Sequence, residues 1–157
     1  MINILYEDNH LLVAIKPINV PVQEDQSKDL SFLDMLKQYL KEKYQKPGKV
    51  YLGLVHRLDR PVGGLMVFAK TSKAMERLSK QVREHQVEKK YYAVVLGNIN
   101  KKGNFIDRLL KDERRNIVYV NSKGKEARLS YEKIDQKKEY SLVSVSLETG
   151  RSHQIRV

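Results

Sequence analysis

The first part of the chain alternates short apolar runs with polar turn residues. Residues 2–6 and 11–16 are apolar runs separated by the polar sequence EDNH. This pattern predicts a β-hairpin, because Asp and Asn tolerate turn conformations. Apolar residues then recur at spacings of three and four from Leu33 to Tyr44, which predicts a helix. Ser31 precedes that pattern and can cap the helix.

Two more strands and a second helix are predicted before residue 90. The apolar runs at residues 50–55 and 65–69 read as strands. Residues 72 to about 85 place four apolar side chains on one helical face and Lys and Arg on the other. These apolar positions are Ala74, Met75, Leu78 and Val82.

The second half of the chain is predicted to be rich in strands. Residues 127–132 alternate apolar and polar side chains, which is typical of a strand with one face in water. The clearest strands are expected at residues 91–96, 116–120, 127–133 and 140–147, and the final HQIRV also reads as a strand. Together the elements predict an α+β fold, a mixed and mostly antiparallel sheet with a few flanking helices. The length suits one domain over residues 1–157.

The charge of the chain indicates an anionic partner. Thirty Lys and Arg against 19 Asp and Glu give a formal net charge of +11 at pH 7. Such an excess favours nucleic acid or an anionic membrane surface, although solubility alone also favours charged surfaces. Residues 70–90 carry seven Lys or Arg against three Glu, and residues 101–128 carry nine against four acids. We expect these stretches to contact phosphates.

Composition also narrows the classes of site and compartment. The chain has no cysteine, which excludes disulfides, thiolate metal sites and a cysteine nucleophile. The N-terminus lacks a basic stretch followed by a long apolar core, and no apolar run approaches the ~20 residues of a membrane-spanning helix. We therefore expect a cytoplasmic protein with no membrane association.

The most unusual sequence is HRLDR, residues 56–60, placed between two apolar runs. Arg57 and Arg60 flank Asp59, and nearby positive charge favours the ionised carboxylate. Such an aspartate can act as a nucleophile, a general base or a metal ligand. The alternative is a salt-bridged turn that joins two strands. The following Gly63-Gly64 pair permits positive backbone dihedrals or close approach of another backbone.

A second polar cluster, TGRSHQIR, spans residues 149–156. Its two arginines, histidine and glutamine crowd the end of a predicted strand. They can bind phosphate or supply a partner for a buried carboxylate. The alternative is a solvated edge of the sheet.

Four sequence blocks together resemble the RluA-type pseudouridine synthases. HRLDRPVGGLMVFAKT resembles the family's central motif HRLDxxTSGLLxFAKT, and LETGRSHQIRV is similar to its later motif LxTGRxHQIRVH. VEKKYYAVVLG matches K-x-Y-x-A-x-V-x-G, and the opening ILYEDNHLLVAIKPINVPVQ resembles the first block, in which a lysine-proline pair follows a hairpin. The blocks occur in the family's order over nearly the whole chain, which makes the resemblance far more specific than any single motif.

The resemblance implies an activity and three catalytic residues. The family isomerises uridine to pseudouridine in structured RNA, without a cofactor or metal. Its catalytic aspartate corresponds to Asp59, and the tyrosine that packs against the target base corresponds to Tyr91. The family's partner for the catalytic aspartate corresponds to Arg156. Side chains alternate along a strand, so Tyr92 is expected on the opposite face, in the core.

The same motifs imply how the substrate is bound. Arg57 corresponds to a residue that in some members fills the gap left by a flipped nucleotide. A base stacked inside an RNA helix must leave the stack before it can react. His56, Lys89 and Arg151 are the further candidate substrate-binding residues.

The chain departs from the family pattern in two respects. Val62 and Gly63 stand where the family usually has Thr-Ser, which implies altered loop detail after the catalytic position. The family continues beyond HQIRVH, so we expect a catalytic domain without its C-terminal strands, and without an S4 domain. The expected partner is structured RNA, either rRNA or tRNA, bound by a monomer. The alternative is a catalytically incomplete RNA-binding module.

Overall fold

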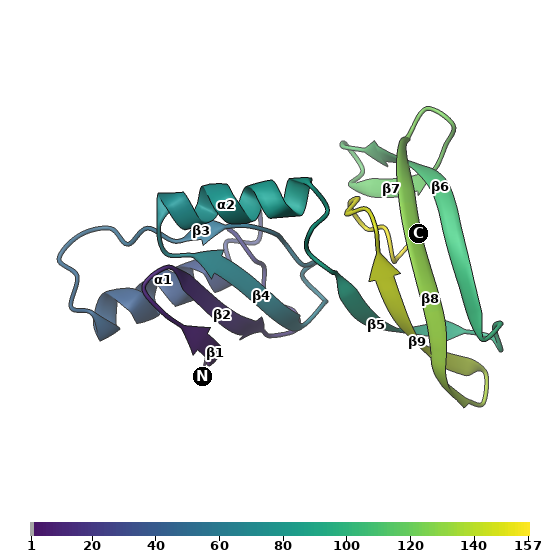
Figure 1. Ribbon diagram of the computed structural model, residues 1–157, viewed down its shortest axis with the longest axis horizontal. Helices are drawn as coiled ribbons and strands as arrows, with labels where there is room; N and C mark the ends of the chain where they lie inside the picture. The colour runs from purple at the N-terminus through teal and green to yellow at the C-terminus, as the bar shows by residue number, and fades with distance from the viewer. Residues whose placement is uncertain (1) are drawn as a thin grey trace. The chain divides into compact units, whose positions relative to one another are not determined.

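The computed structural model describes residues 2–157, which form two helices and nine strands (Figure 1). The helices are α1 (Phe32–Lys43) and α2 (Ser72–Arg83). The strands are β1 (Asn3–Glu7), β2 (Leu11–Lys16), β3 (Gly53–Leu54), β4 (Gly64–Ala69), β5 (Lys90–Leu96), β6 (Lys102–Asp112), β7 (Ile117–Val120), β8 (Lys125–Lys137) and β9 (Tyr140–Leu147). They form two sheets, and every pair of neighbouring strands described within residues 2–157 is antiparallel, so the predicted α+β class is confirmed.

The chain divides into two compact units, Met1–Glu84 and His85–Val157. The first unit contains a four-stranded sheet in the order β1-β2-β4-β3. Leu12 and Phe68 are cross-strand partners on one face of this sheet, and both are fully buried. Phe32 of α1 packs edge-on against Phe68, with 5.8 Å between ring centroids. Full burial of each such side chain contributes about 1.5–3 kcal/mol, so α1 and this sheet face form the core of the unit.

Both helices begin where the sequence pattern indicates. The Ser31 hydroxyl accepts a hydrogen bond from the backbone N–H of Asp34 at 3.2 Å, which confirms it as the cap of α1. Thr71 caps α2 in the same way. The prediction that the second helix reaches about residue 85 is wrong by two residues. His85 has φ 56°, a left-handed conformation that cannot continue the helix.

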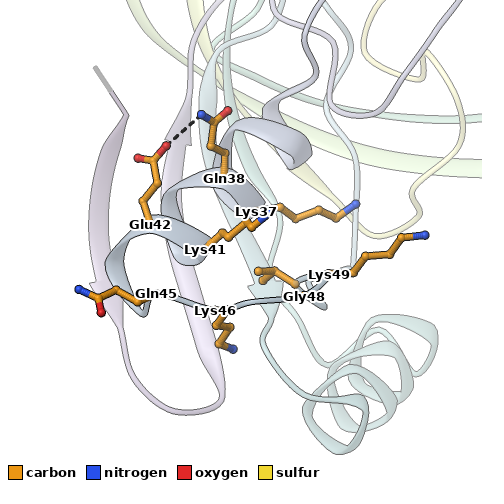
Figure 2. A pocket seen from close by; sticks show the side chains of 9 residues that line it. Lys37, Gln38, Lys41, Glu42, Gln45, Lys46, Gly48 and Lys49 are labelled. Carbon is orange, nitrogen blue, oxygen red and sulfur yellow. Dashed lines mark hydrogen bonds between the residues drawn. The ribbon is translucent and has the colours of Figure 1, made fainter.

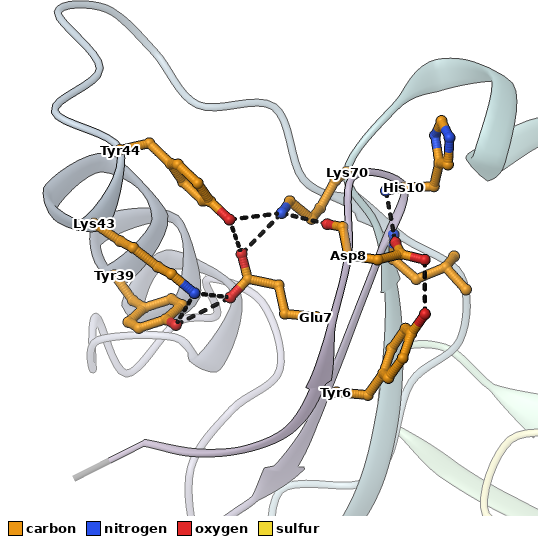
Figure 3. Close-up of polar contacts among 9 residues, drawn as sticks. Tyr6, Glu7, Asp8, His10, Tyr39, Lys43, Tyr44 and Lys70 are labelled. Atoms are coloured by element: carbon orange, nitrogen blue, oxygen red, sulfur yellow. Dashed lines mark hydrogen bonds and ion pairs between the residues drawn. The ribbon is translucent and has the colours of Figure 1, made fainter.

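A single carboxylate connects β1 to α1 and to the end of β4 on the polar side of the first unit (Figure 3). Glu7 accepts hydrogen bonds from Tyr39, Lys43, Tyr44 and Lys70, at 2.6–3.0 Å. Burial alone would raise the pKa of Glu7, but the hydrogen bonds from the two lysines and two tyrosines lower it to about 2. The carboxylate therefore remains charged and links three elements that are distant in the sequence.

The second unit is a five-stranded sheet in the order β5-β9-β8-β6-β7. Its best-buried side chains include Val143 and Val145 of β9, each 3% exposed. Strand β6 was not predicted, because residues 102–112 do not alternate apolar and polar positions cleanly. The strand predicted at residues 127–133 is longer in the structure, as β8, and the one predicted at residues 50–55 is reduced to the two residues of β3.

The prediction that HQIRV forms a strand is wrong. These residues form consecutive turns, in which His153 has φ 54° and its carbonyl accepts from the N–H of Arg156 at 2.8 Å. An extended strand cannot contain that left-handed residue. Among residues 2–157, neither helix is long and apolar enough to span a membrane.

Candidate active site

The HRLDR loop connects β3 to β4 in the first unit, and His56 attaches the loop to the sheet. β3 contains only two residues, so the backbone N–H of Val67 in β4 lies beyond the last β3 partner. The Nε2 atom of His56 accepts that N–H at 3.1 Å. Burial lowers the pKa of His56, which favours the neutral imidazole that this bond requires. This bond gives His56 a role in holding the loop, and its predicted contact with substrate remains a prediction.

Lys16 holds the loop at Arg60, the residue that follows Asp59. Its side chain is fully buried at the end of β2. The ammonium group donates to the carbonyls of Pro17, Val20 and Arg60 at 2.8, 2.7 and 3.1 Å. Burial and the charge of Arg60 lower the pKa of Lys16, while the negative charge of Asp59 acts in the opposite direction. A buried cation therefore lies within electrostatic range of the candidate catalytic carboxylate.

The two arginines of HRLDR have different environments. The guanidinium of Arg60 donates to Asp29 and to the Ser27 hydroxyl, and lies 3.6 Å from Asp25. These acceptors belong to the loop before α1, so Arg60 ties that loop to HRLDR. Arg57 is exposed, and within residues 2–157 its side chain has no hydrogen bond or ion pair. An exposed, uncommitted guanidinium suits the predicted contact with a nucleic acid.

The glycine pair after the loop has both of the properties predicted for it. Gly64 has φ 152°, a conformation that favours glycine. A Cβ on Gly63 would lie 3.3 Å from the carbonyl oxygen of Lys16 and 2.9 Å from a methyl of Ile18. The missing side chain lets the chain pass closely beside the residue that anchors the loop.

Tyr91 lies on β5 of the second unit, directly opposite Val145 of β9, and is half-buried. Burial alternates along the whole of β5, so neighbouring side chains lie on opposite faces, as predicted for Tyr91 and Tyr92. The prediction that Tyr92 is in the core is wrong, because Tyr92 is 78% exposed. The two tyrosines do point to opposite faces, but the face of Tyr92 is not covered by the rest of this unit.

Two polar side chains hold the TGRSHQIR segment against β8. The hydroxyl of Thr149 accepts the N–H of Arg128 at 2.9 Å. Gln154, only 7% exposed, donates through Nε2 to the Arg128 carbonyl at 3.0 Å. Its Oε1 accepts from the Thr149 hydroxyl and the N–H of Arg151, at 2.9 and 3.0 Å. This segment, which carries Arg151 and Arg156, therefore has a defined conformation rather than a solvated edge.

The ammonium group of Lys89 lies beside that segment, 3.7 Å from where a Cβ on Gly150 would be. Burial and the positive charge of Arg151 lower the pKa of Lys89. Arg151 donates through Nε to the backbone carbonyl of Glu126 at 2.7 Å, which orients its guanidinium. No ion pair with a carboxylate is present for either cation among the described residues. Such a pair favours an anion such as a phosphate.

Lys16 and Gln154 were not among the site residues predicted from the sequence. Strand alternation could have revealed Lys16, because it shares the face of Leu12 and Ala14, both fully buried. Gln154 gave no comparable signal, because its burial depends on the turns that replace the expected strand. Residues 2–157 contain no group of three or more His, Asp or Glu arranged to hold a metal ion.

Comparison with known proteins agrees with these motifs. The family described as RNA pseudouridylate synthase matches residues 10–157. The chain belongs to the RNA pseudouridylate synthase family. This confirms the resemblance inferred from the four sequence blocks.

Several pseudouridylate synthases are similar over almost the whole chain. Ribosomal large subunit pseudouridine synthase C from Vibrio cholerae is 36% identical over 155 residues, which cover 98% of this chain and 47% of that protein. Synthase C from Buchnera aphidicola is 38% identical over 163 residues, covering 99% and 49%. Synthase D from Nitrosomonas europaea is 35% identical over 159 residues, covering 99% and 45%. The chain thus spans about half the length of these curated relatives.

Solved structures support the pseudouridylate synthase fold. Human RNA pseudouridylate synthase domain containing 4 superposes with a TM-score of 0.82 at 25% identity, covering 99% of this chain and 62% of that one. Human RNA pseudouridylate synthase domain containing 1 superposes with a TM-score of 0.79 at 22% identity, covering 100% of this chain and 63% of that one.

Proposed function

We propose that this protein isomerises uridine to pseudouridine in RNA, with Asp59 as the catalytic carboxylate. The observation that carries this proposal is the anchored HRLDR loop, in a chain that belongs to the pseudouridylate synthase family. His56 anchors the loop before Asp59, and Lys16 anchors it after Asp59, at the carbonyl of Arg60. The Asp59 carbonyl also accepts the N–H of Val62 at 3.0 Å, which closes a turn. Fixed geometry of this kind suits a catalytic group.

The reaction requires a charged carboxylate near the ribose. The C1′–N1 glycosidic bond breaks, the uracil turns, and a C1′–C5 bond forms. N1 gains a proton and C5 loses one, so no oxidant, reductant or cofactor is consumed. Positive charge develops on the sugar as the glycosidic bond breaks, and an ionised Asp59 can stabilise or capture that charge.

Tyr91 and Arg156 are the two further catalytic residues that we propose. Their place in the family motifs supports this assignment. Tyr91 lies on a strand whose register is fixed by pairing with β9, which suits a group that packs against a base and handles the C5 proton. Arg156 follows the turn held by Gln154.

The substrate-binding role is proposed for His56, Arg57, Lys89 and Arg151. Lys89 and Arg151 supply adjacent positive charge for a phosphate. Arg57 is exposed, which supports a role in filling the gap left by an extruded uridine. A residue that enters the stack offsets part of the few kcal/mol that extrusion costs.

We propose structured RNA as the partner, bound by a monomer in the cytoplasm. The names of the similar bacterial proteins favour ribosomal RNA of the large subunit as the substrate. Transfer RNA is the second substrate class that the motifs allow. The charge of +11 supports either RNA through phosphate contacts.

The competing function is an RNA-binding module without catalysis. Release of tritium from RNA that contains 5-tritiated uridine distinguishes the two, because only isomerisation removes the C5 hydrogen. The chain should release tritium, Asp59→Asn should abolish release while still binding RNA, and the control Asp107→Asn should behave like the parent chain. Binding without release by the parent chain would support the module, and full release by Asp59→Asn would refute the assignment of Asp59.

A further inference from the structure

The first unit contains a basic hollow that the proposed reaction does not use (Figure 2). It has a volume of about 730 Å³ and lies between the C-terminal half of α1 and the segment that follows it. Four lysines and one glutamate account for all its charged side chains. The lining residues that bear on the argument are Lys37, Lys41, Glu42, Lys46 and Lys49.

The charges of this hollow are largely uncompensated. Glu42 accepts a hydrogen bond from Gln38 at 2.9 Å, and forms no ion pair with a lysine of the hollow. Lys37 lies 3.3 Å from Asp34. For Lys41, Lys46 and Lys49, no carboxylate within residues 2–157 lies at ion-pair distance. Clustering like charges without counter-ions is unfavourable, which makes an external anion the natural partner.

Two other lysines near α1 have structural roles, because they pair with a carboxylate. Lys43 and Lys70 donate to the buried Glu7 at 2.8 Å, and so hold elements together. The C-terminal carbonyls of α1 can favour a cation in the last turn, which accounts for Lys41. They do not account for Lys46 and Lys49, which lie beyond the end of the helix, although the ammonium of Lys46 also lies 5.8 Å from the centre of the Tyr44 ring. Neither residue stabilises the fold through a contact with a carboxylate.

We propose that the hollow beside α1 binds the phosphodiester backbone of RNA, as a contact separate from the HRLDR loop. The proposal deepens the proposed function and rests on it for the identity of the polyanion. Ammonium groups on flexible stems suit phosphates as point charges, without selecting a base. Residues 46–50 lead through β3 into HRLDR, so the two contacts belong to the same unit. The hollow would hold RNA flanking the uridine that reacts.

The test removes two positive charges from the hollow, at positions beyond the helix, and compares the effect on RNA binding with the removal of two positive charges elsewhere on the surface. The variant is Lys46→Gln/Lys49→Gln, and the matched control is Lys137→Gln/Lys138→Gln, at an exposed hairpin between β8 and β9. Affinity for a fluorescein-labelled RNA hairpin is measured at several salt concentrations. Two lost phosphate contacts should lower the slope of log affinity against log salt by about 1.4–1.8, and weaken binding by about tenfold at low salt. The control should retain the parent slope.

A charge-preserving variant separates phosphate binding from structural damage. Lys46→Arg/Lys49→Arg should bind like the parent chain, because the positive charge remains. Equal slopes for the glutamine variant and its control, or an arginine variant as weak as the glutamine one, would overturn the proposal. Tritium release by the parent chain is assayed in parallel. If the parent chain releases tritium but the glutamine variant keeps the parent salt slope, only this inference is refuted. If the glutamine variant has a lower salt slope but the parent chain releases no tritium, the catalytic function is refuted and the hollow remains an RNA contact.

Discussion

The ammonium group of Lys16 donates a hydrogen bond to the backbone carbonyl of Arg60, over 3.1 Å. The two residues are 44 positions apart in the chain, so this bond connects the end of β2 to the loop that carries Asp59. Lys16 also donates to the carbonyls of Pro17 and Val20. Because Lys16 is fully buried, water cannot take over its hydrogen bonds without opening the core. The candidate catalytic loop is therefore held by the interior of the first unit.

Replacing Lys16 with Met should loosen the loop. The substitution keeps the apolar stem but leaves three carbonyls without their donor, so the free energy of unfolding should fall by about 2–4 kcal/mol. Urea denaturation followed by circular dichroism measures this loss. The exposed control Lys138→Met should change stability by less than about 0.5 kcal/mol. If Lys16→Met were as stable as the control, the anchoring role would be wrong.

Glu7 should make stability depend on acid pH. Its folded-state pKa of about 2 lies below the unfolded value of 4.5. The resulting stabilisation, about 3 kcal/mol, is present above pH 4.5 and is lost as the pH falls through 2. Glu7→Gln should therefore be less stable than the parent chain at pH 7 and nearly equal to it near pH 2. Exposed Glu24→Gln is the control, and parallel curves for Glu7→Gln and the parent chain would contradict the prediction.

His56 should lose its anchoring bond on protonation. Its pKa is lowered below the ordinary 6.5, so its contribution to stability is complete above pH 6.5 and is lost as the pH falls through the folded-state value. The ring titration can be followed by NMR, and a midpoint at or above 6.5 would refute the buried neutral imidazole. In His56→Gln the amide oxygen can accept from Val67 at all these pH values, so this part of the acid sensitivity should disappear.

Gln154 should determine the order of the segment that carries Arg151 and Arg156. Gln154→Ala removes three hydrogen bonds at a buried position, and should destabilise the second unit by about 2–3 kcal/mol. The amide of Arg151, which donates to Gln154, should then exchange with solvent much faster. Gln86→Ala alters an exposed glutamine and should leave that exchange unchanged. Unchanged exchange in Gln154→Ala would show that the turns alone order the segment.

Periodicity predicted the elements whose cores are local and regular. The Ser31 cap and the apolar spacing of α1 and the hairpin of β1 and β2 are all present. The failures occurred where long-range contacts decide the structure. The pattern at 50–55 suggested a full strand, yet β4 pairs with only two of its residues and then with the side chain of His56. No local sequence pattern reveals that a histidine side chain takes the place of a strand backbone as the partner of β4.

The candidate site was also predicted only in part from local sequence. The motifs selected Asp59, Arg57 and the segment around Gln154, but adjacency in sequence was a poor guide to charge partners. Arg60 directs its guanidinium to Asp29, while the negative charge of Asp59 favours the charged form of Lys16, from another strand, and so acts to raise its pKa. The pairing of β2 with β4, in which Lys16 lies opposite Gly64, brings Lys16 to the loop.

The carboxylate of Glu7 also has a consequence for the order of folding events. Its partners lie 32, 36, 37 and 63 positions away along the chain. Closing loops of this length costs entropy before any of the bonds can form, whereas the β1–β2 hairpin and the helices can form locally. The Glu7 cluster should therefore assemble late, after the rate-limiting barrier. In stopped-flow experiments Glu7→Gln should accelerate unfolding and leave the refolding rate nearly unchanged. The cluster therefore slows unfolding and prolongs the lifetime of the native state.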